Sequence, residues 1–173
     1  IDVIEHGYFA SDEGIEEIGN LDRWLVMTPS IFYTDARIKT LPPNLIQPHL
    51  QQREEVGQRM SAAIKSGIKF AVGTDGMHGG LAQEIQYLTD FGASAGAAIR
   101  AATIQAAILC GLENEIGTLG AGKAADVIGV DGNPYEDISA LSRVATVIQA
   151  GKIIRFKHGG MRALNRSDTG GTT

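Results

Sequence analysis

The stretch from Lys69 to His78, KFAVGTDGMH, carries a carboxylate where a buried strand would end. The apolar residues Phe70–Val72 suit a strand that is covered on both faces, as in a parallel sheet. Gly73 lies just before Asp75, and a glycine lets the backbone turn sharply or approach a ligand closely. On this stretch alone two interpretations have similar weight. Asp75 serves a site at the mouth of the strand, or it caps an ordinary turn or helix.

A histidine stands in a similar position at the start of the chain. Ile1–Glu5 is a short, mainly apolar strand, and His6 and Gly7 follow it. His6 alone would more often be an ordinary hydrogen-bonded histidine, but a His and an Asp that each follow a strand and precede a Gly form a stronger pair. In parallel α/β barrels the chemistry lies at the carboxyl ends of the strands. Imidazole and carboxylate both suit zinc and similar divalent ions, so His6 and Asp75 are the candidate metal pair.

Two ligands do not complete a catalytic zinc site, which usually takes three protein ligands and a water. His78 follows Asp75 by three residues, after two turn-forming positions, and could face the same mouth. His49 follows Pro48 in a long connection and is expected to be merely exposed. His158 lies in the C-terminal tail and is given no role.

Other catalytic and binding patterns are weaker. Gly117–Lys123, GTLGAGK, fits the body of a phosphate-binding loop, but Ala124 follows where Ser or Thr would bind magnesium. A strand follows this loop instead of a helix, so we interpret it as a turn joining two β elements and not as a nucleotide-binding module. The chain has no GxSxG elbow, and Cys110 lies in an apolar helical run without a flanking base.

Strands and helices must alternate to bring the candidate residues together. Hydrophobic periodicity and capping residues predict three strands, at Ile1–Glu5, Trp24–Thr28 and Lys69–Thr74. They predict helices from Ser11 to about Gly19, at Gln51–Ser66 with Gly67 as its C-cap, at Leu81–Phe91, and at Ser94–Leu112 with a restart at Thr103. Ile31–Pro48 is expected to be a long loop. This rhythm is that of a parallel sheet.

The predicted secondary structure changes near Leu112 from alternating strands and helices to short strands and turns, and we place a domain boundary there. A strand at Ala124–Asp131, a brief helix or turn at Asp137–Arg143, and a hairpin turning at Ala150–Gly151 indicate a small β unit. The predicted division is therefore 1–112, 113–157, and a flexible tail at 158–173.

Composition limits the classes of partner. The net charge of −5 and the absence of a basic stripe argue against nucleic acid. No apolar run approaches the roughly 20 residues of a membrane span, so no membrane partner is expected. The single cysteine suits a reducing compartment, and we expect a cytoplasmic location.

Together these stretches resemble a known family. IEHG, the Thr28–Pro29 segment, VGTDG and the block IGTLGAGKAADVIGVDGNP occur in the order found in the C-terminal part of the amidohydrolase superfamily, with prolidase and imidazolonepropionase-like members as the nearest look-alikes. The resemblance runs from Ile1 to about Phe156. It implies an α/β fold: the C-terminal part of a (β/α)8 TIM barrel, about strands 6 to 8, followed by a small β-sandwich segment.

The resemblance also implies roles for individual residues. His6 and Asp75 would bind metal, with zinc as the expected cofactor and one or two divalent ions in the complete enzyme. Asp75 would be the catalytic residue that takes a proton from a metal-activated water and passes it to the leaving nitrogen. The substrate would be a small-molecule amide, dipeptide, N-acyl amino acid or lactam, with His78 and Tyr33 as substrate-binding candidates.

Other ligands of that family have no counterpart in this chain: an HxH pair, a carboxylated lysine and a further histidine. The chain also starts without Met inside a strand, so we expect a fragment or processed piece with about three of eight barrel strands, inactive alone. Its exposed strand edges would be covered by the rest of the barrel or by pairing in a homo-oligomer, or would leave it poorly stable. The rival hypothesis is a catalytically incomplete fragment acting only as an association or structural module.

Overall fold

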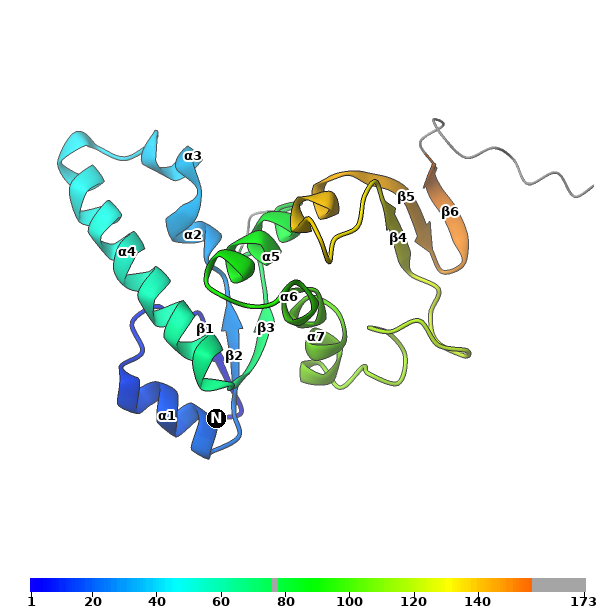
Figure 1. The fold of residues 1–173 in the computed structure, drawn as a ribbon, viewed down its shortest axis with the longest axis horizontal. Coiled ribbons are helices and arrows are strands. Elements are labelled where there is room, and N and C mark those ends of the chain that lie inside the picture. Colours follow the sequence, from blue (N-terminus) through cyan, green and yellow to red (C-terminus); the bar gives the residue numbers. More distant parts are fainter. Residues whose placement is uncertain (76–77, 157–173) are drawn as a thin grey trace, which may run out of the picture.

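The computed structural model describes residues 1–75 and 78–156. Its first sheet has three strands, β1 (Val3–Glu5), β2 (Trp24–Met27) and β3 (Lys69–Val72), in the order β1-β2-β3. All neighbours are parallel, with Val3 opposite Trp24 and Trp24 opposite Lys69. The predicted parallel βαβ arrangement is confirmed (Figure 1). Because the strands are parallel and in register, their carboxyl ends form one edge of the sheet.

Helices α1 (Asp12–Asn20) and α4 (Pro43–Ser66) connect the three strands. Ser11 caps α1 as predicted, because its hydroxyl accepts a hydrogen bond from the Gly14 amide at 3.1 Å. Gly67 ends α4 in the left-handed conformation, with φ of 76°, also as predicted. The two helices pack over one face of the sheet. The most completely buried side chains of the resulting core include Leu25, Met27, Val56, Met60 and Leu88.

The predicted loop at 31–48 is wrong. Short helices α2 (Ser30–Tyr33) and α3 (Asp35–Ile38) occupy much of it, and α4 begins at Pro43 rather than at Gln51. Proline is favoured at the first positions of a helix, where its fixed φ suits the fold and its missing N–H has no helical partner. Pro48 is also inside α4. The prolines therefore belong to the start of this helix and not to an irregular connection.

Three further helices follow β3: α5 (Leu81–Asp90), α6 (Ala95–Ala101) and α7 (Ile104–Leu109). The predicted restart at Thr103 is confirmed, since α6 ends at Ala101 and α7 begins at Ile104 with Thr103 as its N-cap residue. The Thr103 hydroxyl donates to the Ile99 carbonyl at 2.8 Å. Ala98 and Ala101 have no exposed surface, as expected for small residues on a closely packed helix. Cys110 lies at the end of α7 and is exposed.

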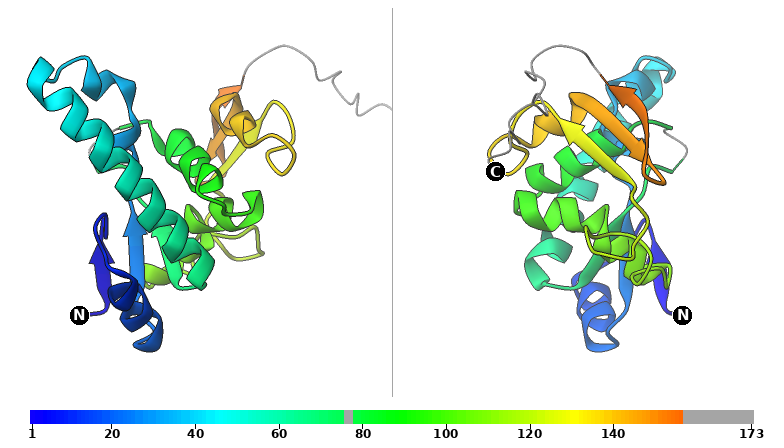
Figure 2. Two further views of the ribbon diagram at one scale, coloured as in Figure 1. Left: turned by 60° about the vertical axis from the view of Figure 1, so that its left-hand side comes forward. Right: turned by 90° about the vertical axis from the view of Figure 1, so that its right-hand side faces the viewer.

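A second sheet contains β4 (Val127–Val130), β5 (Val144–Gln149) and β6 (Lys152–Phe156), all antiparallel and in chain order. The predicted hairpin turn is confirmed, because both Ala150 and Gly151 have positive φ. Figure 2 shows that α5, α6 and α7 lie between the two sheets. The division at Leu112 stays a prediction, and the predicted tail at 158–173, with His158, lies outside the described residues.

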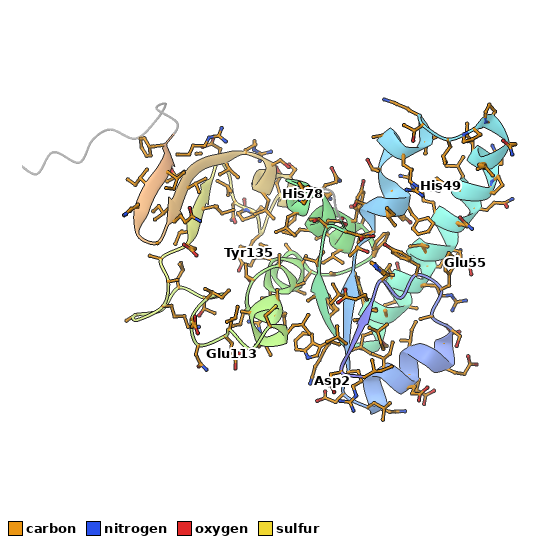
Figure 3. The ribbon with its side chains drawn as sticks, turned by 180° about the vertical axis from the view of Figure 1, so that it is seen from behind. Asp2, His49, Glu55, His78, Glu113 and Tyr135 are labelled. Carbon is orange, nitrogen blue, oxygen red and sulfur yellow. The ribbon has the colours of Figure 1, made fainter. Side chains whose placement is uncertain are left out.

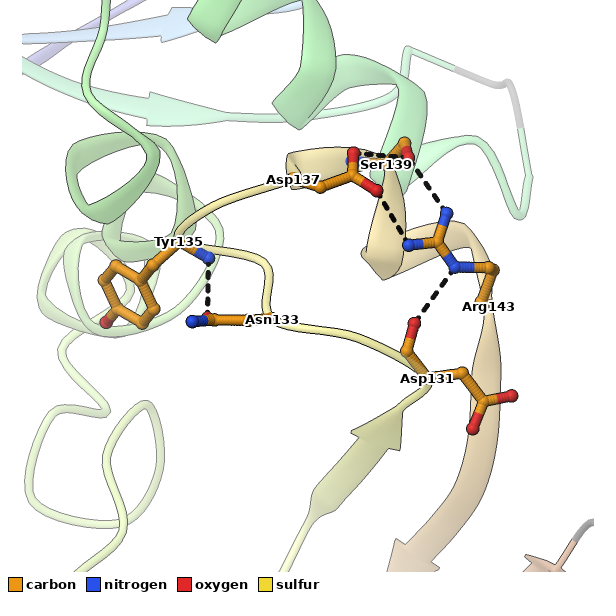
Figure 4. Close-up of polar contacts among 6 residues, drawn as sticks. All are labelled: Asp131, Asn133, Tyr135, Asp137, Ser139 and Arg143. Atoms are coloured by element: carbon orange, nitrogen blue, oxygen red, sulfur yellow. Dashed lines mark hydrogen bonds and ion pairs between the residues drawn. The ribbon is translucent and has the colours of Figure 1, made fainter. Parts of the chain in front are cut away.

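A short 3₁₀ helix, η1 (Ile138–Ser142), joins β4 to β5 and packs against α5. Arg143 holds this connection together: its guanidinium donates to the Asp131 carbonyl at 3.0 Å, to the Ser139 hydroxyl at 3.0 Å and to the Asp137 carboxylate at 2.8 Å (Figure 4). Ile138 and Leu141 contact the main core from this segment. The second sheet is thereby linked to the helices that cover the first.

The glycine-rich loop Gly117–Lys123 joins α7 to β4, so its interpretation as a turn between two β elements is wrong. The Lys123 ammonium is turned inward: it donates to the Glu113 carbonyl at 2.5 Å and to the Thr118 hydroxyl at 2.6 Å. These bonds close the loop on itself and occupy the amine that a phosphate-binding loop would present. Within residues 1–75 and 78–156, no helix is long and apolar enough to cross a membrane.

Candidate functional site

The carboxyl ends of the parallel strands bring the two predicted metal residues to one edge of the sheet. His6 follows β1, Asp75 follows β3 by three residues, and Thr28 follows the central strand β2 between them. The His6 amide extends the ladder by donating to the Val26 carbonyl at 2.8 Å. His6 is half-buried and Asp75 is exposed. The sheet therefore places an imidazole and a carboxylate on the same side, separated by one strand.

Both residues have a backbone conformation that is unusual for their types. His6 has φ of 71° and Asp75 has φ of 42°, in the region that favours glycine. At His6 the chain makes a three-residue γ-turn, because the Gly7 amide donates to the Glu5 carbonyl at 2.9 Å. Such conformations cost of order 1–3 kcal/mol and cluster at functional sites. The chain turns tightly at each of these two strand ends.

The side chain of His6 is held by Thr28 and Tyr8. Its Nδ1 lies 2.9 Å from the Thr28 hydroxyl, and its ring stacks on Tyr8 with 5.3 Å between centroids. The Tyr8 hydroxyl donates to the Thr28 carbonyl at 3.0 Å and lies 2.5 Å from the Thr28 hydroxyl. Thr28 is only 3% exposed, whereas His6 and Tyr8 are half-buried. His6 Nε2 is the ring nitrogen that these contacts do not use.

The electrostatics at this edge link Asp75 to its surroundings. Burial raises the pKa of Tyr8 above its ordinary value, the hydrogen bond with Thr28 lowers it, and the negative charge of Asp75 raises it further. The same negative charge also contributes to the raised pKa of Glu84. The charge of Asp75 therefore acts on both Tyr8 and Glu84.

Glu84 is a buried carboxylate that the sequence patterns did not single out. It has no exposed surface, and its Oε2 accepts a hydrogen bond from the Ser30 amide at 3.0 Å, which ties α5 to the turn after β2. Within the described part of the chain its Oε1 has no hydrogen-bond partner. Burial raises the pKa of Glu84. A signal was present in the predicted helix Leu81–Phe91, because Glu84 lies four residues before the buried Leu88 and therefore on the same helix face.

Tyr33 lies in the helical layer. Its hydroxyl donates to the Arg53 carbonyl at 3.0 Å, and its ring packs against Tyr87 and Phe91 with centroids 5.3 and 5.0 Å away. The hydroxyl also approaches α4 so closely that only glycine fits at position 57. These contacts place the ring between α4 and α5, and its role in substrate binding stays a prediction.

The two remaining histidines of interest lie on different elements (Figure 3). His78 is exposed just before α5, and its predicted role in substrate binding stays a prediction. The expectation that His49 is exposed is wrong: it is only 7% exposed and stacks on Phe32 with 5.6 Å between centroids. The reason is that α4 starts early, which turns His49 toward α2 instead of leaving it in a loop.

The donors at this edge fit part of a metal site. His6 offers Nε2 while Nδ1 is held by Thr28, which is how a metal-binding histidine is usually oriented, and Asp75 offers an exposed carboxylate. Across residues 1–75 and 78–156, no cluster of three or more His, Cys, Asp or Glu side chains could hold a metal ion. The described residues thus supply two ligands of the type that zinc accepts.

Comparison with known proteins identifies a family. The sequence profile of the Amidohydrolase family matches residues 3–154. An ochratoxinase from Aspergillus niger is 37% identical over 99 residues, which are 54% of this chain and 21% of that protein. The matched segment therefore spans about a fifth of the length of this curated relative.

Solved structures give the same result for the fold. The crystal structure of a Xaa-Pro dipeptidase with bound methionine in the active site superimposes with a TM-score of 0.78 at 31% identity, covering 90% of this chain and 40% of the dipeptidase chain. The crystal structure of A. niger ochratoxinase gives a TM-score of 0.76 at 28% identity, covering 92% of this chain and 38% of that chain. This chain thus covers about two fifths of the length of each of these two solved structures.

Proposed function

Because this chain belongs to the amidohydrolase family, we propose that it forms part of a hydrolase that uses a divalent metal ion, with zinc as the expected one, to cleave a C–N bond. The bond is that of a small amide, a dipeptide, an N-acyl amino acid or a lactam. The similarity to a Xaa-Pro dipeptidase and to an ochratoxinase supports this class of substrate.

One observation carries the proposal: His6 and Asp75 follow strands β1 and β3 at one edge of a parallel sheet, and both have positive φ. In barrel enzymes the active site lies at the carboxyl ends of the strands. We propose that β1, β2 and β3 are strands 6, 7 and 8 of a (β/α)8 barrel. The sheet β4-β5-β6 would then be the C-terminal contribution to a small β-sandwich.

Each residue has a defined task in this proposal. His6, through its free Nε2, and Asp75, through its carboxylate, would hold the metal ion. When bound, the ion makes a water more acidic and polarises the scissile carbonyl. A carboxylate oxygen of Asp75 accepts the proton of the attacking water and later returns it to the leaving nitrogen.

Replacement of Asp75 by Asn tests this role. Asn keeps the size of the side chain but cannot accept the proton, so hydrolysis of a Xaa-Pro dipeptide or an N-acyl amino acid by the intact protein should fall at least about 100-fold. Asp131→Asn is the matched control, because Asp131 is an exposed residue just after β4 in the second sheet and should leave turnover unchanged. Turnover close to wild type in Asp75→Asn would rule out the proposed role of Asp75.

The metal content of the intact protein separates this proposal from a purely structural role for the chain. We expect divalent metal in the purified protein and a lower metal content in His6→Ala, with unchanged circular dichroism. A protein that contains no metal after purification and takes up none from added zinc would favour association as the only function of this chain.

A further inference from the structure

Thr28 is the shared partner of two side chains at the proposed metal edge. Its hydroxyl lies 2.9 Å from His6 Nδ1 and 2.5 Å from the Tyr8 hydroxyl, and its carbonyl lies 3.0 Å from the same Tyr8 hydroxyl. Thr28 is 3% exposed. The geometry therefore contains three short polar contacts, and the protons available for them can be counted.

Two hydroxyl groups supply one proton each, and a carbonyl supplies none. The contact between Tyr8 and the Thr28 carbonyl therefore needs the proton of Tyr8. The contact between the two hydroxyls then needs the proton of Thr28. No hydroxyl proton is left for the third contact, so the Thr28 oxygen accepts there and His6 Nδ1 carries the proton.

The opposite assignment fails on the same contacts. If Thr28 donated to His6 Nδ1, the Tyr8 proton would be needed between the two hydroxyls. The Tyr8 oxygen and the Thr28 carbonyl would then be 3.0 Å apart with no proton between them. Two oxygens this close without a proton between them repel each other, and the Thr28 carbonyl would lose its hydrogen bond from Tyr8. Only protonated Nδ1 on His6 satisfies all three contacts.

We propose that Thr28, with its hydroxyl proton held by Tyr8, is a positioning residue that fixes His6 in the tautomer with the proton on Nδ1. The lone pair is then on Nε2, the nitrogen assigned above to the metal ion. A hydrogen bond to the other ring nitrogen is the usual means by which a protein sets the tautomer of a metal ligand. This inference rests on the proposed function of His6 and adds the two residues that prepare it.

The ring is held in orientation as well as in tautomer. It stacks on Tyr8 with an angle of 23° between the planes, and its backbone is fixed in the γ-turn. Tyr8 thus contacts His6 directly and also controls the proton of Thr28. The stack and the proton count are separable, because phenylalanine at position 8 keeps the first and removes the second.

Nitrogen-15 NMR of the metal-free, intact protein tests the tautomer directly, with histidine labelled and His6 assigned through a His6→Gln variant. At about pH 8.5 an ordinary histidine is neutral, and we expect the proton of His6 on Nδ1. Thr28→Val and Tyr8→Phe should both shift His6 toward the Nε2–H form, whereas Thr28→Ser should retain the wild-type signal. Thr40→Val, which removes an exposed hydroxyl bonded to the Arg37 carbonyl, is the matched control.

Zinc competition against a chelator gives a second readout. Loss of such an outer contact typically weakens metal binding by about 10–100-fold, so Thr28→Val should bind zinc at least about tenfold more weakly than wild type, and Thr28→Ser about as tightly. A wild-type His6 with its proton on Nε2, or a Thr28→Val variant with unchanged tautomer and zinc affinity, would overturn the inference. A wild-type protein that binds no zinc but shows the expected tautomers would overturn the metal proposal and leave the role of Thr28 in place.

Discussion

At the scale of single residues, the site depends on two residues, His6 and Asp75, whose backbone conformation is unfavourable for their residue types. His6 and Asp75 both have φ in the region where glycine is at ease, and in each case the following residue in the sequence is a glycine. The parallel strands alone would not give the side chains of His6 and Asp75 their orientation, because that orientation also depends on the turn at each residue. The turns at the strand ends are therefore part of the site, and the contacts with Thr28 and Tyr8 help to offset the cost of the turn at His6.

Gly57 is the residue at which the helical layer is most tightly fitted. A methyl group there would lie 2.1 Å from the Tyr33 hydroxyl oxygen. Alanine normally stabilises a helix over glycine by about 0.5–1 kcal/mol, but overpacking costs about 1–3 kcal/mol. We expect Gly57→Ala to lower the free energy of unfolding by about 1–2 kcal/mol, measured by urea denaturation of the intact protein.

A second substitution identifies the cause. Tyr33→Phe removes the oxygen that the new methyl group meets and leaves a ring carbon at 3.4 Å, so it should restore much of the stability lost in Gly57→Ala. Gly14→Ala is the control, since its nearest neighbour would be at an ordinary 3.6 Å and alanine there should be neutral or stabilising. Equal destabilisation of the single and double variants would show that the clash with Tyr33 is not the reason.

At the scale of elements, Glu84 joins α5 to the turn after β2 with a buried carboxylate. Its bond to the Ser30 amide holds the turn that begins with Thr28, two residues earlier. The pKa of Glu84 is raised, first by burial and to a smaller extent by the charge of Asp75. In the unfolded chain this group has the ordinary value of 4.5.

The raised pKa gives a prediction with a definite sign. Below pH 4.5 Glu84 is protonated in both states, and as the pH rises through the interval up to the folded pKa, the unfolded state loses its proton first. The contribution of Glu84 to stability therefore falls over that interval in the wild type. In Glu84→Gln this fall should be missing, so the variant gains stability relative to wild type as the pH rises, measured by urea denaturation at several pH values. Glu55→Gln, at an exposed position on α4, should follow the wild-type profile.

A comparison of the helices and strands with the expectations above shows which features the sequence alone could predict. The strands, the Ser11 cap, the Gly67 terminus and the hairpin at Ala150–Gly151 were predicted because each depends on neighbours along the chain. The helices within 30–48 were missed because this proline-containing segment was interpreted as a long loop, whereas Pro43 starts a helix. His6 and Asp75 were placed correctly at strand ends. The roles of Thr28, Tyr8 and Glu84 depend on contacts between distant segments, which periodicity does not reveal.

At the scale of the whole molecule, η1 couples the two sheets. Leu141 and Ile138 contact the main core, and the bonds of Arg143 connect η1 to the strands beside it. Leu141→Ala should lower the free energy of unfolding by about 2 kcal/mol, because a Leu→Ala change in a core costs about 2–5 and this side chain is only half-buried. Proteolysis within the Gly117–Lys123 loop should also become faster.

A surface leucine provides the control for this coupling. Leu119 is 85% exposed in that same loop, so Leu119→Ala should change neither stability nor the rate of cleavage beyond experimental error. If Leu141→Ala unfolds as readily as wild type and is cleaved at the same rate, η1 does not couple the sheets. The Arg143 network would then hold the second sheet together only locally.

The lengths of the connections between paired strands set the order in which the two sheets can form. The β5–β6 hairpin closes over two residues, so its pairing requires almost no loop entropy and can form within microseconds. The parallel pairs β1–β2 and β2–β3 form only after long segments have closed into loops, from Val3 to Trp24 and from Trp24 to Lys69. Closing these longer loops costs more entropy and is slower. The strand ends that carry His6 and Asp75 thus meet late in folding. The proposed catalytic edge is accordingly one of the last regions to form and, during synthesis or refolding, the one most exposed to misassembly.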